Sequence, residues 1–556
     1  MEQRGELSAS DAQRLGRRAL DHGEGPRIDA LSKPGTRTCN NAAREAIRRW
    51  LRSNGADGPP APPPPSSIGH LESSSLPLRV YYQTEADQPL AQQVLIAAEL
   101  AWQKQVVELS YPKPYTAANY TDPAVPGLYL YVGDTGMGGG GFTEWIRNVP
   151  DTPQADCSAR VAIDSANYEG DVAFVVAHEF NHATQMATDC VEAISAWENF
   201  ATASGDYFYP GDWTTQYFIQ AFQQYPEMPV DYWQNPDGSS DLSYFQYGAS
   251  LFPIFLRDRF GKGSQVLLRD AWYSFAQEGT VTCSFFGCVA DKPNDPDWFK
   301  GLDNMLHLHG STFDDAFDEF AAWRAITGSR DDGFHFQSGS SIGEVSTAAT
   351  HYLKQGGAKG KLDVHEYGSR YIELRTDGYS GPVHVQVKPD AAASWSVSLL
   401  SWRKAEPVER RATVLPAGES ADVYVASAQG IQRMMLVVSQ RKDATHLPDE
   451  QEYETTREFE YVVDDDLEPD AGTKPEPMPE AGVDAKSDAK PDAKLDAGKD
   501  VDAEPIGVET SADDGGCDCR ASRGTAPRRS VFSVLLAAIA VCLRRRSGWR
   551  KSLARA

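Results

Sequence analysis

The stretch that decides the fold runs from residue 172 to residue 187 and reads Val-Ala-Phe-Val-Val-Ala-His-Glu-Phe-Asn-His-Ala-Thr-Gln-Met-Ala. It contains no Gly or Pro, and its Ala and Met residues favour a helix. His178 and His182 are four residues apart, so on a helix their imidazoles lie one turn apart and can face one ion. Glu179 flanks such an ion without binding it. The stretch therefore predicts a helix with two metal-binding histidines on one face.

The spacing His178-Glu179-x-x-His182 is the pattern of zinc metallopeptidases. Zinc lowers the pKa of a bound water to about 7, and a neighbouring carboxylate can then take its proton. We therefore expect Zn²⁺ as cofactor and Glu179 as the catalytic base. Two simpler explanations compete with this one: a chance match among 11 histidines, and a pair of ordinary surface histidines.

A catalytic zinc needs a third protein ligand. A metzincin would have Gly at position 185 and His at 188, but the chain has Gln185 and Thr188, which excludes that class. The other main class takes a glutamate from the next helix. A turn after Thr188 would let a second helix over 195–204 run back past the first. Glu198 lies inside that helix and is the better ligand, whereas Glu192 lies in or near the turn and stays an alternative.

The order of residues continues beyond the two histidines. It reads His178-Glu-Phe-Asn-His-Ala-Thr-Gln185, then Asp189, Trp197-Glu198 and Ala201-Thr202. This segment resembles the MXAN-type metalloproteases, which lie within the gluzincin group that includes thermolysin. Their pattern is His-Glu-Phe-Phe-His-Ala-x-Gln, a short turn with Asp, an aromatic residue before the Glu ligand, and Ala-Thr after it. The resemblance implies a zinc site made of His178, His182 and Glu198.

The chain departs from this family pattern at several points. Asn181 replaces a usual aromatic residue, and Asn199-Phe200 replaces a small Gly-Thr pair. The gap from His182 to Glu198 is shorter than in thermolysin. The segment that begins at Glu192 is similar to the thermolysin ligand segment at a different distance, so Glu192 remains open as the third ligand.

Composition bounds the remaining possibilities. A chain of 556 residues with 41% hydrophobic residues exceeds one domain and can bury a large core. Its net charge of −26 argues against nucleic acid as a partner. Two cysteine pairs, Cys157 with Cys190 and Cys283 with Cys288, would form disulfides in an exported protein, and buried free thiols are the alternative.

The fold class we expect is α+β. A zincin-like catalytic domain, with a small mixed sheet and a helical half, precedes an all-β sandwich domain and a disordered stalk. Expected early elements are strands at 78–82, 128–132 and 160–164, a helix over 90–109, and a flexible glycine-rich loop at 137–142. An exposed edge strand would let an extended peptide add to the sheet. The predicted segments are an N-terminal arm and Pro-rich linker (1–76), the metallopeptidase domain (77–345), the sandwich (346–463), the acidic stalk (464–516) and a sorting or membrane tail (517–556).

The C-terminal tail carries Gly-Cys-Asp-Cys519, an apolar run over 531–543, and Arg544-Arg-Arg546. This run of 13 residues, apolar except for Ser533, is short for a full membrane span of about 20. The three parts, in this order, resemble the MYXO-CTERM class of sorting signals. The resemblance implies membrane attachment through the tail, a sorting protease acting near Cys517–Cys519, and display at the cell surface or outer membrane. A plain tail anchor and a Cys-x-Cys metal site are the alternatives.

How export begins is open, because residues 1–30 carry charges throughout and have no apolar core, so they do not form a secretory signal as written.

The leading functional hypothesis is a zinc-dependent peptidase, most simply an endopeptidase, that cleaves a protein or peptide substrate. A zinc-bound water attacks the peptide bond with Glu179 as general base. The main alternative is a catalytically inactive, surface-displayed adhesive or scaffold protein with a zincin fold. Tyr247, Tyr207 and His335 are unranked candidates for stabilising the oxyanion.

Overall fold

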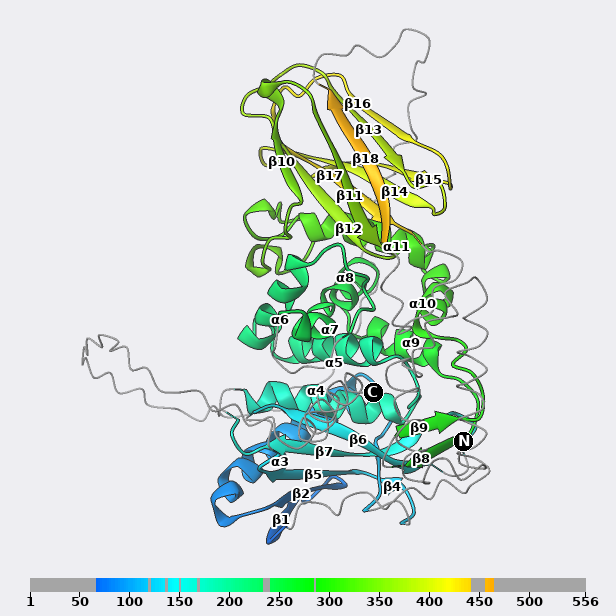
Figure 1. Cartoon of the computed structure of the whole chain (residues 1–556). Helices are drawn as coiled ribbons and strands as arrows, with labels where there is room; N and C mark the ends of the chain where they lie inside the picture. The colour runs from blue at the N-terminus through cyan, green and yellow to red at the C-terminus, as the bar shows by residue number, and fades with distance from the viewer. Residues whose placement is uncertain are drawn as a thin grey trace, which may run out of the picture. The chain divides into compact units, whose positions relative to one another are not determined.

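The computed structural model describes residues 67–118, 122–135, 139–149, 152–167, 171–233, 241–284, 287–441 and 456–464. Predictions for most of the N-terminal arm, for the stalk beyond residue 464 and for the tail with Cys517–Cys519 lie outside these residues. The described part combines several sheets with a group of helices (Figure 1), which confirms the predicted α+β class.

A five-stranded sheet comes first in the chain, with the order β1-β2-β5-β7-β6. Its strands are β1 (Gly69–Glu72), β2 (Leu78–Tyr82), β5 (Leu128–Gly133), β7 (Cys157–Asp164) and β6 (Gly141–Asn148). The central strands β2, β5 and β7 are parallel, and the edge strands β1 and β6 run antiparallel to their neighbours. The three predicted strands all lie in this sheet, so its parallel centre follows the sequence pattern.

Strand β6 begins inside the stretch for which the sequence predicts a flexible loop. Gly141 pairs with Ile163 and opens the ladder with β7. Just before it, the Gly140 amide donates to Asn167 Oδ1 (2.6 Å), and the Asn167 side chain donates back to the Gly140 carbonyl (2.7 Å). The prediction of a loose loop over 137–142 is wrong for residues 141 and 142. Pairing with a distant strand, which the local glycine content does not reveal, decides their conformation.

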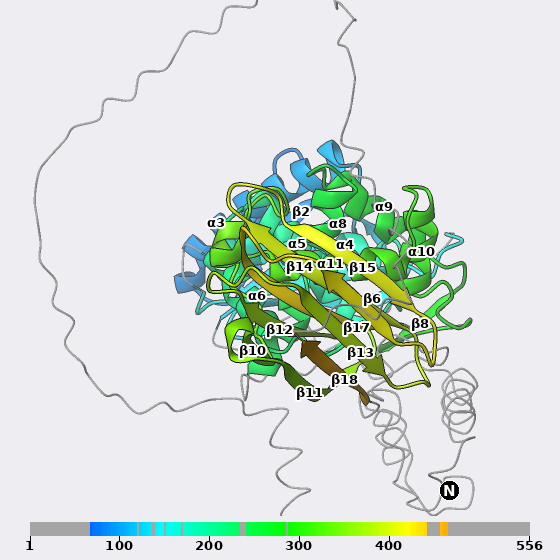
Figure 2. The same cartoon turned by 90° about the horizontal axis from the view of Figure 1, so that it is seen from above.

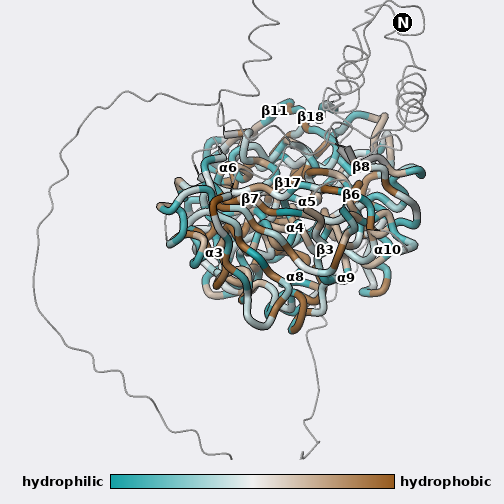
Figure 3. The backbone as a smooth tube through the Cα atoms, turned by 90° about the horizontal axis from the view of Figure 1, so that it is seen from below, coloured by the Kyte–Doolittle hydropathy of each residue, from teal (hydrophilic) through white to brown (hydrophobic). Residues whose placement is uncertain are grey.

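Helix α3 (Gln88–Ala101) and helix α4 (Val172–Met186) pack against each other and against the sheet. In the hydropathy colouring of Figure 3, brown apolar stretches are visible around α3. The predicted helix over 90–109 is present, but its last part, η3 (Trp102–Glu108), is wound more widely as a π-helix. Such segments are rare and often lie at functional sites. In this chain, η3 contains a fully buried glutamine, Gln105, which contacts helix α4.

The middle of the chain is mainly helical and packs around an aromatic-rich core. Its helices are α5 (Ile194–Phe208), α6 (Trp213–Gln224), α7 (Phe245–Gly248), α8 (Leu251–Arg259), α9 (Val266–Phe275), α10 (Trp298–His307) and α11 (Phe313–Ala325). As predicted, Thr312 caps α11 by accepting a hydrogen bond from the Asp315 amide (3.1 Å), and Phe313, Phe317 and Phe320 are buried. The smaller elements are η2 (Glu85–Asp87), β3 (Tyr115–Thr116), β4 (Val125–Pro126), η4 (Asp241–Tyr244), β8 (Val281–Ser284), β9 (Gly287–Ala290), η5 (Gly328–Arg330), η6 (Gly339–Ser341) and η7 (Leu353–Gln355).

The last part of the described chain forms two sheets around one apolar core, the arrangement of a β-sandwich (Figure 2). One sheet has the order β10 (Ala349–Tyr352), β12 (Ser369–Arg375), β17 (Ile431–Gln440), β14 (Trp395–Arg403) and β15 (Glu409–Leu415). The other has the order β11 (Ala358–His365), β18 (Thr456–Asp464), β13 (Val383–Pro389) and β16 (Ala421–Val425). Trp395 and Phe459, one from each sheet, are almost fully buried in the shared core.

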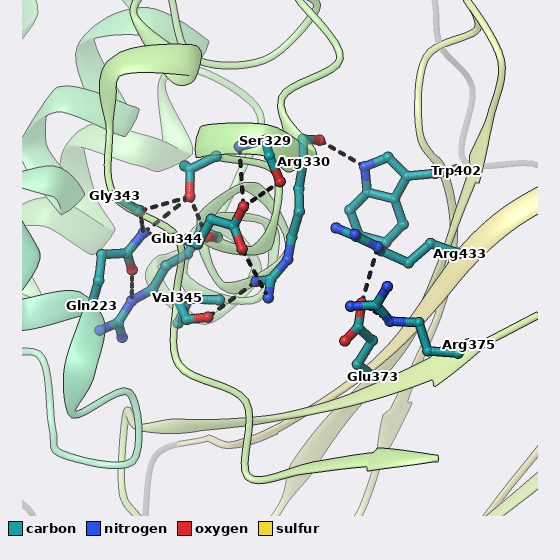
Figure 4. A network of polar contacts seen from close by, with 12 residues as sticks. Gln223, Ser329, Arg330, Gly343, Glu344, Val345, Glu373, Arg375, Trp402 and Arg433 are labelled. Atoms are coloured by element: carbon teal, nitrogen blue, oxygen red, sulfur yellow. Dashed lines mark hydrogen bonds and ion pairs between the residues drawn. The ribbon is translucent and has the colours of Figure 1, made fainter. Parts of the chain in front are cut away.

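Helix α11 and the first of these sheets share a small apolar cluster that includes Ala325, Leu400 and Met435. Polar contacts flank this cluster (Figure 4). The Trp402 indole N–H donates to the Arg330 carbonyl (2.7 Å), and the Arg330 guanidinium pairs with Glu344 (3.3 Å). The sheet is thus joined to the helical part by both buried apolar area and specific hydrogen bonds.

The cysteines differ from the prediction in one respect. Cys157 and Cys190 are buried free thiols, so the predicted disulfide between them is wrong for this structure. Their sulfur atoms and that of Cys283 all lie within 4.8 Å of one another. Cys283 itself is in a disulfide bond, and the β8–β9 hairpin places it opposite residue 288, its predicted partner. Because a disulfide sulfur is not a thiolate, this group does not offer three metal ligands.

Candidate metal centre

Helices α4 and α5 bring three possible metal ligands together. His178 and His182 lie one turn apart on α4, and Glu198 projects from α5, which packs against α4 after a tight turn. The two Nε2 atoms are 3.0 Å apart, and Glu198 Oε2 lies 3.2 Å from His178 Nε2 and 3.4 Å from His182 Nε2. The three side chains singled out by the sequence therefore converge on one point.

These separations can be compared with what a zinc ion requires. Tetrahedral zinc with ligand bonds of about 2.0–2.1 Å places neighbouring donor atoms about 3.3 Å apart. The three observed separations of 3.0, 3.2 and 3.4 Å scatter around that value. Two imidazole nitrogens and one carboxylate oxygen also suit zinc chemically. The residues present thus fit a tetrahedral ion whose fourth position is left to a non-protein ligand.

The alternative ligand Glu192 lies elsewhere. Its Oε1 accepts hydrogen bonds from the Ala193 amide (2.6 Å) and from the Asn294 side chain (3.0 Å). It is buried in the turn between the two helices and does not join the histidines, so the alternative in which Glu192 completes the site is wrong. The reason is geometric: a residue in the turn faces the turn's own amides, whereas position 198 comes one helical segment later and faces back toward α4.

Each histidine is oriented by a second side chain. His182 Nδ1 lies 2.8 Å from Gln185 Oε1, and His178 Nδ1 lies 3.4 Å from Thr202 Oγ1. These contacts leave both Nε2 atoms directed at the common point. Gln185 and Thr202 belong to the pattern that carries the family resemblance, and the structure gives both positions a physical role. Such outer contacts fix the tautomer and the ring orientation of a ligating histidine.

The carboxylate and the imidazoles of the centre shift each other's pKa. Burial alone would raise the pKa of Glu198, but the adjacent imidazoles of His182 and His178 outweigh it and lower that pKa to about 2. Burial lowers the pKa of His182, whereas Glu198 raises it, and the net result is a pKa of about 9. Each group therefore stabilises the charged form of the other when no ion lies between them.

Glu179 lies next to the three ligands and is held by the edge strand β6. Thr143 Oγ1 donates to Glu179 Oε2 (2.7 Å) and also contacts the Glu179 carbonyl oxygen (3.0 Å). Gly141 makes the approach possible, because a Cβ atom at that position would lie 3.1 Å from Glu179 Cγ and 2.9 Å from the Ala162 carbonyl oxygen. Burial raises the pKa of Glu179, and the charges of His178 and His182 oppose that rise.

The structure ranks the three oxyanion candidates. The ring of Tyr247 lies 6.0 Å from that of His178, and burial, together with the charges of Glu198 and Glu179, raises its pKa well above the usual value. Tyr207 is 37% exposed and lies against Arg257. His335 pairs with Asp332 (2.8 Å) and packs against Trp323. Of the three, Tyr247 is the candidate beside the metal centre.

A further pair of buried amides joins α4 to η3. Gln105 donates to the Ala177 carbonyl (2.9 Å), and Asn181 donates to Gln105 Oε1 (3.0 Å). This network gives the side-chain amide of Asn181 a buried hydrogen-bond partner. Sequence reasoning missed both Gln105 and Thr143, since no local pattern links a residue on η3 or β6 to a helix more than 30 positions away. A buried polar residue within an apolar helix, Asn181, is the one signal that could have suggested such a partner.

Comparisons with known proteins do not identify a family. No family model matches the chain, and no curated protein matches it. Among solved structures, a mitogen of Yersinia pseudotuberculosis aligns with 21% of this chain and 91% of its own at 11% identity and a TM-score of 0.15. The pre-peptidase C-terminal domain of a Bacillus anthracis collagenase aligns with 22% and 99% at 8% identity and a TM-score of 0.15. Scores this low carry no argument about fold or function.

The predicted membrane tail lies outside the described residues. Within the described ranges, no helix combines the length and the apolar character that crossing a bilayer requires.

Proposed function

We propose that this chain is a zinc-dependent peptidase with a zincin-like catalytic region of the gluzincin type. The observation that carries the proposal is the convergence of His178, His182 and Glu198 at the donor separations of a tetrahedral zinc site. Structural zinc sites are closed by four protein ligands, whereas this centre offers three. The open fourth position and the neighbouring Glu179 both support a hydrolytic role over a purely structural one.

The residues around the centre suit peptide hydrolysis. A divalent ion held by the three ligands would acidify a water molecule and polarise the substrate carbonyl. Glu179, oriented by Thr143, takes the proton of the attacking water and passes it to the leaving amine. Tyr247 offers a phenolic O–H on the side of His178, where it can donate a hydrogen bond to the developing oxyanion.

The edge strand gives the substrate a place to bind. Strand β6 is the last strand of its sheet and carries both residues that contact Glu179. β8 packs against β6, and the Val281 amide donates to the Asn148 side chain at the end of that strand. An extended peptide that adds to β6 nearer Gly141 would run past the metal centre. Because the tail over 517–556 resembles sorting signals, we also propose that it displays the protein at the cell surface.

The test compares wild-type full-length protein with the Glu179→Gln variant. We expect both to bind one equivalent of zinc, and only the wild type to cleave casein. Glu144→Gln on the same strand is the matched control, since Glu144 pairs with Arg160 and does not contact the centre. Equal cleavage by wild type and Glu179→Gln would contradict the mechanism, and bound zinc without cleavage by the wild type would favour the inactive adhesive or scaffold protein.

A further inference from the structure

A continuous row of aromatic rings leads away from the metal centre. Tyr247 contacts the ring of His178 at 6.0 Å, and Phe218 stacks on Tyr247 at 4.9 Å. Phe218 also stacks on Tyr244 at 5.6 Å, and Tyr244 meets Tyr217 at 5.5 Å. The last ring is Trp213, whose centroid lies 6.4 Å from that of Tyr217. We call these five residues (Trp213, Tyr217, Phe218, Tyr244 and Tyr247) the aromatic row.

The aromatic row becomes more exposed with distance from the centre. Phe218, Tyr244 and Tyr247 are half-buried, whereas Tyr217 is 48% and Trp213 60% exposed. Trp213 and Tyr217 are four residues apart on α6, so they lie one turn apart on the same face. The opposite face of α6 is buried through Ile219 and Phe222, so core packing does not account for the two exposed rings.

Trp213 is held in its exposed position. Its indole N–H donates to Asp171 Oδ1 (2.9 Å), the residue that precedes helix α4. The bond fixes the ring between the start of α6 and the start of the metal-site helix. Isolated exposed apolar residues are normal on protein surfaces, but an exposed ring that is fixed and continuous with a catalytic centre is pre-organised for binding. Aromatic rings in this arrangement favour other aromatic rings.

We propose that the aromatic row is the substrate-recognition surface of the centre and selects peptides with an aromatic side chain close to the scissile bond. The inference rests on the proposed peptidase function for the identity of the ligand as a peptide. The half-buried rings contact the residue nearest the centre, and Tyr217 and Trp213 contact residues further along the chain. The aromatic row thus sets the preference, whereas β6 aligns the backbone without regard to sequence.

The test uses two fluorescent peptides that differ only in Phe or Ala at the positions a few residues from one cleavable bond, where Tyr217 and Trp213 would contact them. For the full-length wild type, we expect kcat/KM to be about 10-fold higher for the Phe peptide, the scale of one good aromatic contact. Trp213→Ala and Tyr217→Ala should bring this ratio close to 1, and Trp213→Phe should keep most of it. Tyr273→Ala removes an equally exposed tyrosine on α9 and should leave the ratio unchanged. Thermal unfolding of each variant excludes loss of fold as the cause.

Fluorescence anisotropy of the same peptides on the Glu179→Gln protein separates this inference from the proposed function. In one outcome, the wild type cleaves neither peptide, but the Phe peptide binds about 10-fold more tightly than the Ala peptide, and Trp213→Ala removes this preference. The aromatic row is then a recognition surface, and the peptidase assignment is wrong. If cleavage occurs with the same Phe-to-Ala ratio in wild type, Trp213→Ala and Tyr217→Ala, the peptidase stands and the aromatic row is not the recognition surface. Absence of both cleavage and Phe-selective binding overturns the inference.

Discussion

Each histidine of the candidate metal centre is oriented by a side chain that the pattern of zinc-binding residues alone does not explain. Gln185 faces His182 and Thr202 faces His178, so the ring positions are set by α4 and α5 themselves. Glu198 then completes the set because it faces back from the second helix. A centre that is pre-oriented in this way binds its ion with little rearrangement.

The choice between the two glutamates gives a prediction about bound zinc. Glu198→Gln replaces an anionic ligand by a neutral one at the centre, and we expect it to lose most of its zinc after dialysis. Glu192→Gln makes the same carboxylate-to-amide change in the adjacent turn, where the side chain contacts Ala193 and Asn294 and not the histidines. This variant should retain one equivalent of zinc. Metal analysis of the purified proteins decides the matter; full zinc in Glu198→Gln together with loss in Glu192→Gln would reverse the assignment.

Gly141 gives a second prediction at this scale. A methyl group there would lie 3.1 Å from Glu179 Cγ and 2.9 Å from the Ala162 carbonyl oxygen, so Glu179 must move. Gly141→Ala should lower kcat about 100-fold while zinc content is retained, because a displaced base loses its alignment. Gly343→Ala is the control, since its added methyl group meets nothing closer than 3.9 Å. Unchanged kcat in Gly141→Ala would show that the position of Glu179 does not limit the reaction.

At the scale of elements, the π-helical segment η3 supports α4 through one buried amide. Gln105 is fully buried and links the Ala177 carbonyl to the Asn181 side chain. Both bonds join the π-helical segment to α4 at positions directly before the two histidines. The sequence predicts the helix over 90–109, but periodicity cannot show where its winding changes.

Removing the Gln105 amide should lower the stability of the fold without loss of zinc. Gln105→Leu keeps the volume but leaves the Ala177 carbonyl and the Asn181 amide without their partner, at a cost of about 1–3 kcal/mol. We expect a lower Tm by differential scanning calorimetry, with zinc still bound. Gln103→Leu changes the same residue type at an exposed position on the same segment and should leave the Tm nearly unchanged. An equal Tm for the two variants would show that Gln105 does not support α4.

A buried carboxyl group on α11 makes a prediction about pH. Burial raises the pKa of Asp318 to about 7, although Arg441 and Arg410 lower it, and Asp314 raises it further. Since the folded-state pKa lies above the ordinary value, the stabilising contribution of Asp318 is complete below about pH 4 and is lost as the pH rises through about 7. The Tm of wild type relative to Asp318→Asn should therefore fall between about pH 4.5 and 7.5. Glu319→Gln on the same helix, whose carboxylate pairs with Arg259 instead, is the control, and a difference that does not vary with pH would contradict the raised pKa.

At the scale of the whole molecule, the sequence predicted the features that depend on local spacing. The helix with His178 and His182 and the strands of the parallel centre follow from periodicity over a few residues. Features that depend on distant segments could not be read in the same way. Strand β6 forms by pairing with β7, and Tyr247 reaches His178 from a helix more than 60 positions later. The sequence correctly predicted that Cys157 and Cys190 lie close together, but the disulfide bond that it predicted between them is absent, and both are free thiols.

Two groups of side chains in the described part of the chain gather possible donor atoms, and they differ in the element that would bind an ion; in the second group only Cys157 and Cys190 are free thiols. The centre of His178, His182 and Glu198 offers nitrogen and oxygen, while Cys157, Cys190 and Cys283 gather sulfur atoms within 4.8 Å. Zinc lies about 2.0–2.1 Å from nitrogen or oxygen ligands and about 2.3 Å from sulfur.

Zinc-edge X-ray absorption of the full-length protein carrying one equivalent of zinc is therefore the most direct measurement. The account predicts a shell of nitrogen and oxygen at about 2.0–2.1 Å with the outer scattering of two imidazoles, and no sulfur shell. A sulfur shell at about 2.3 Å, or a spectrum unchanged by Glu198→Gln, would contradict it.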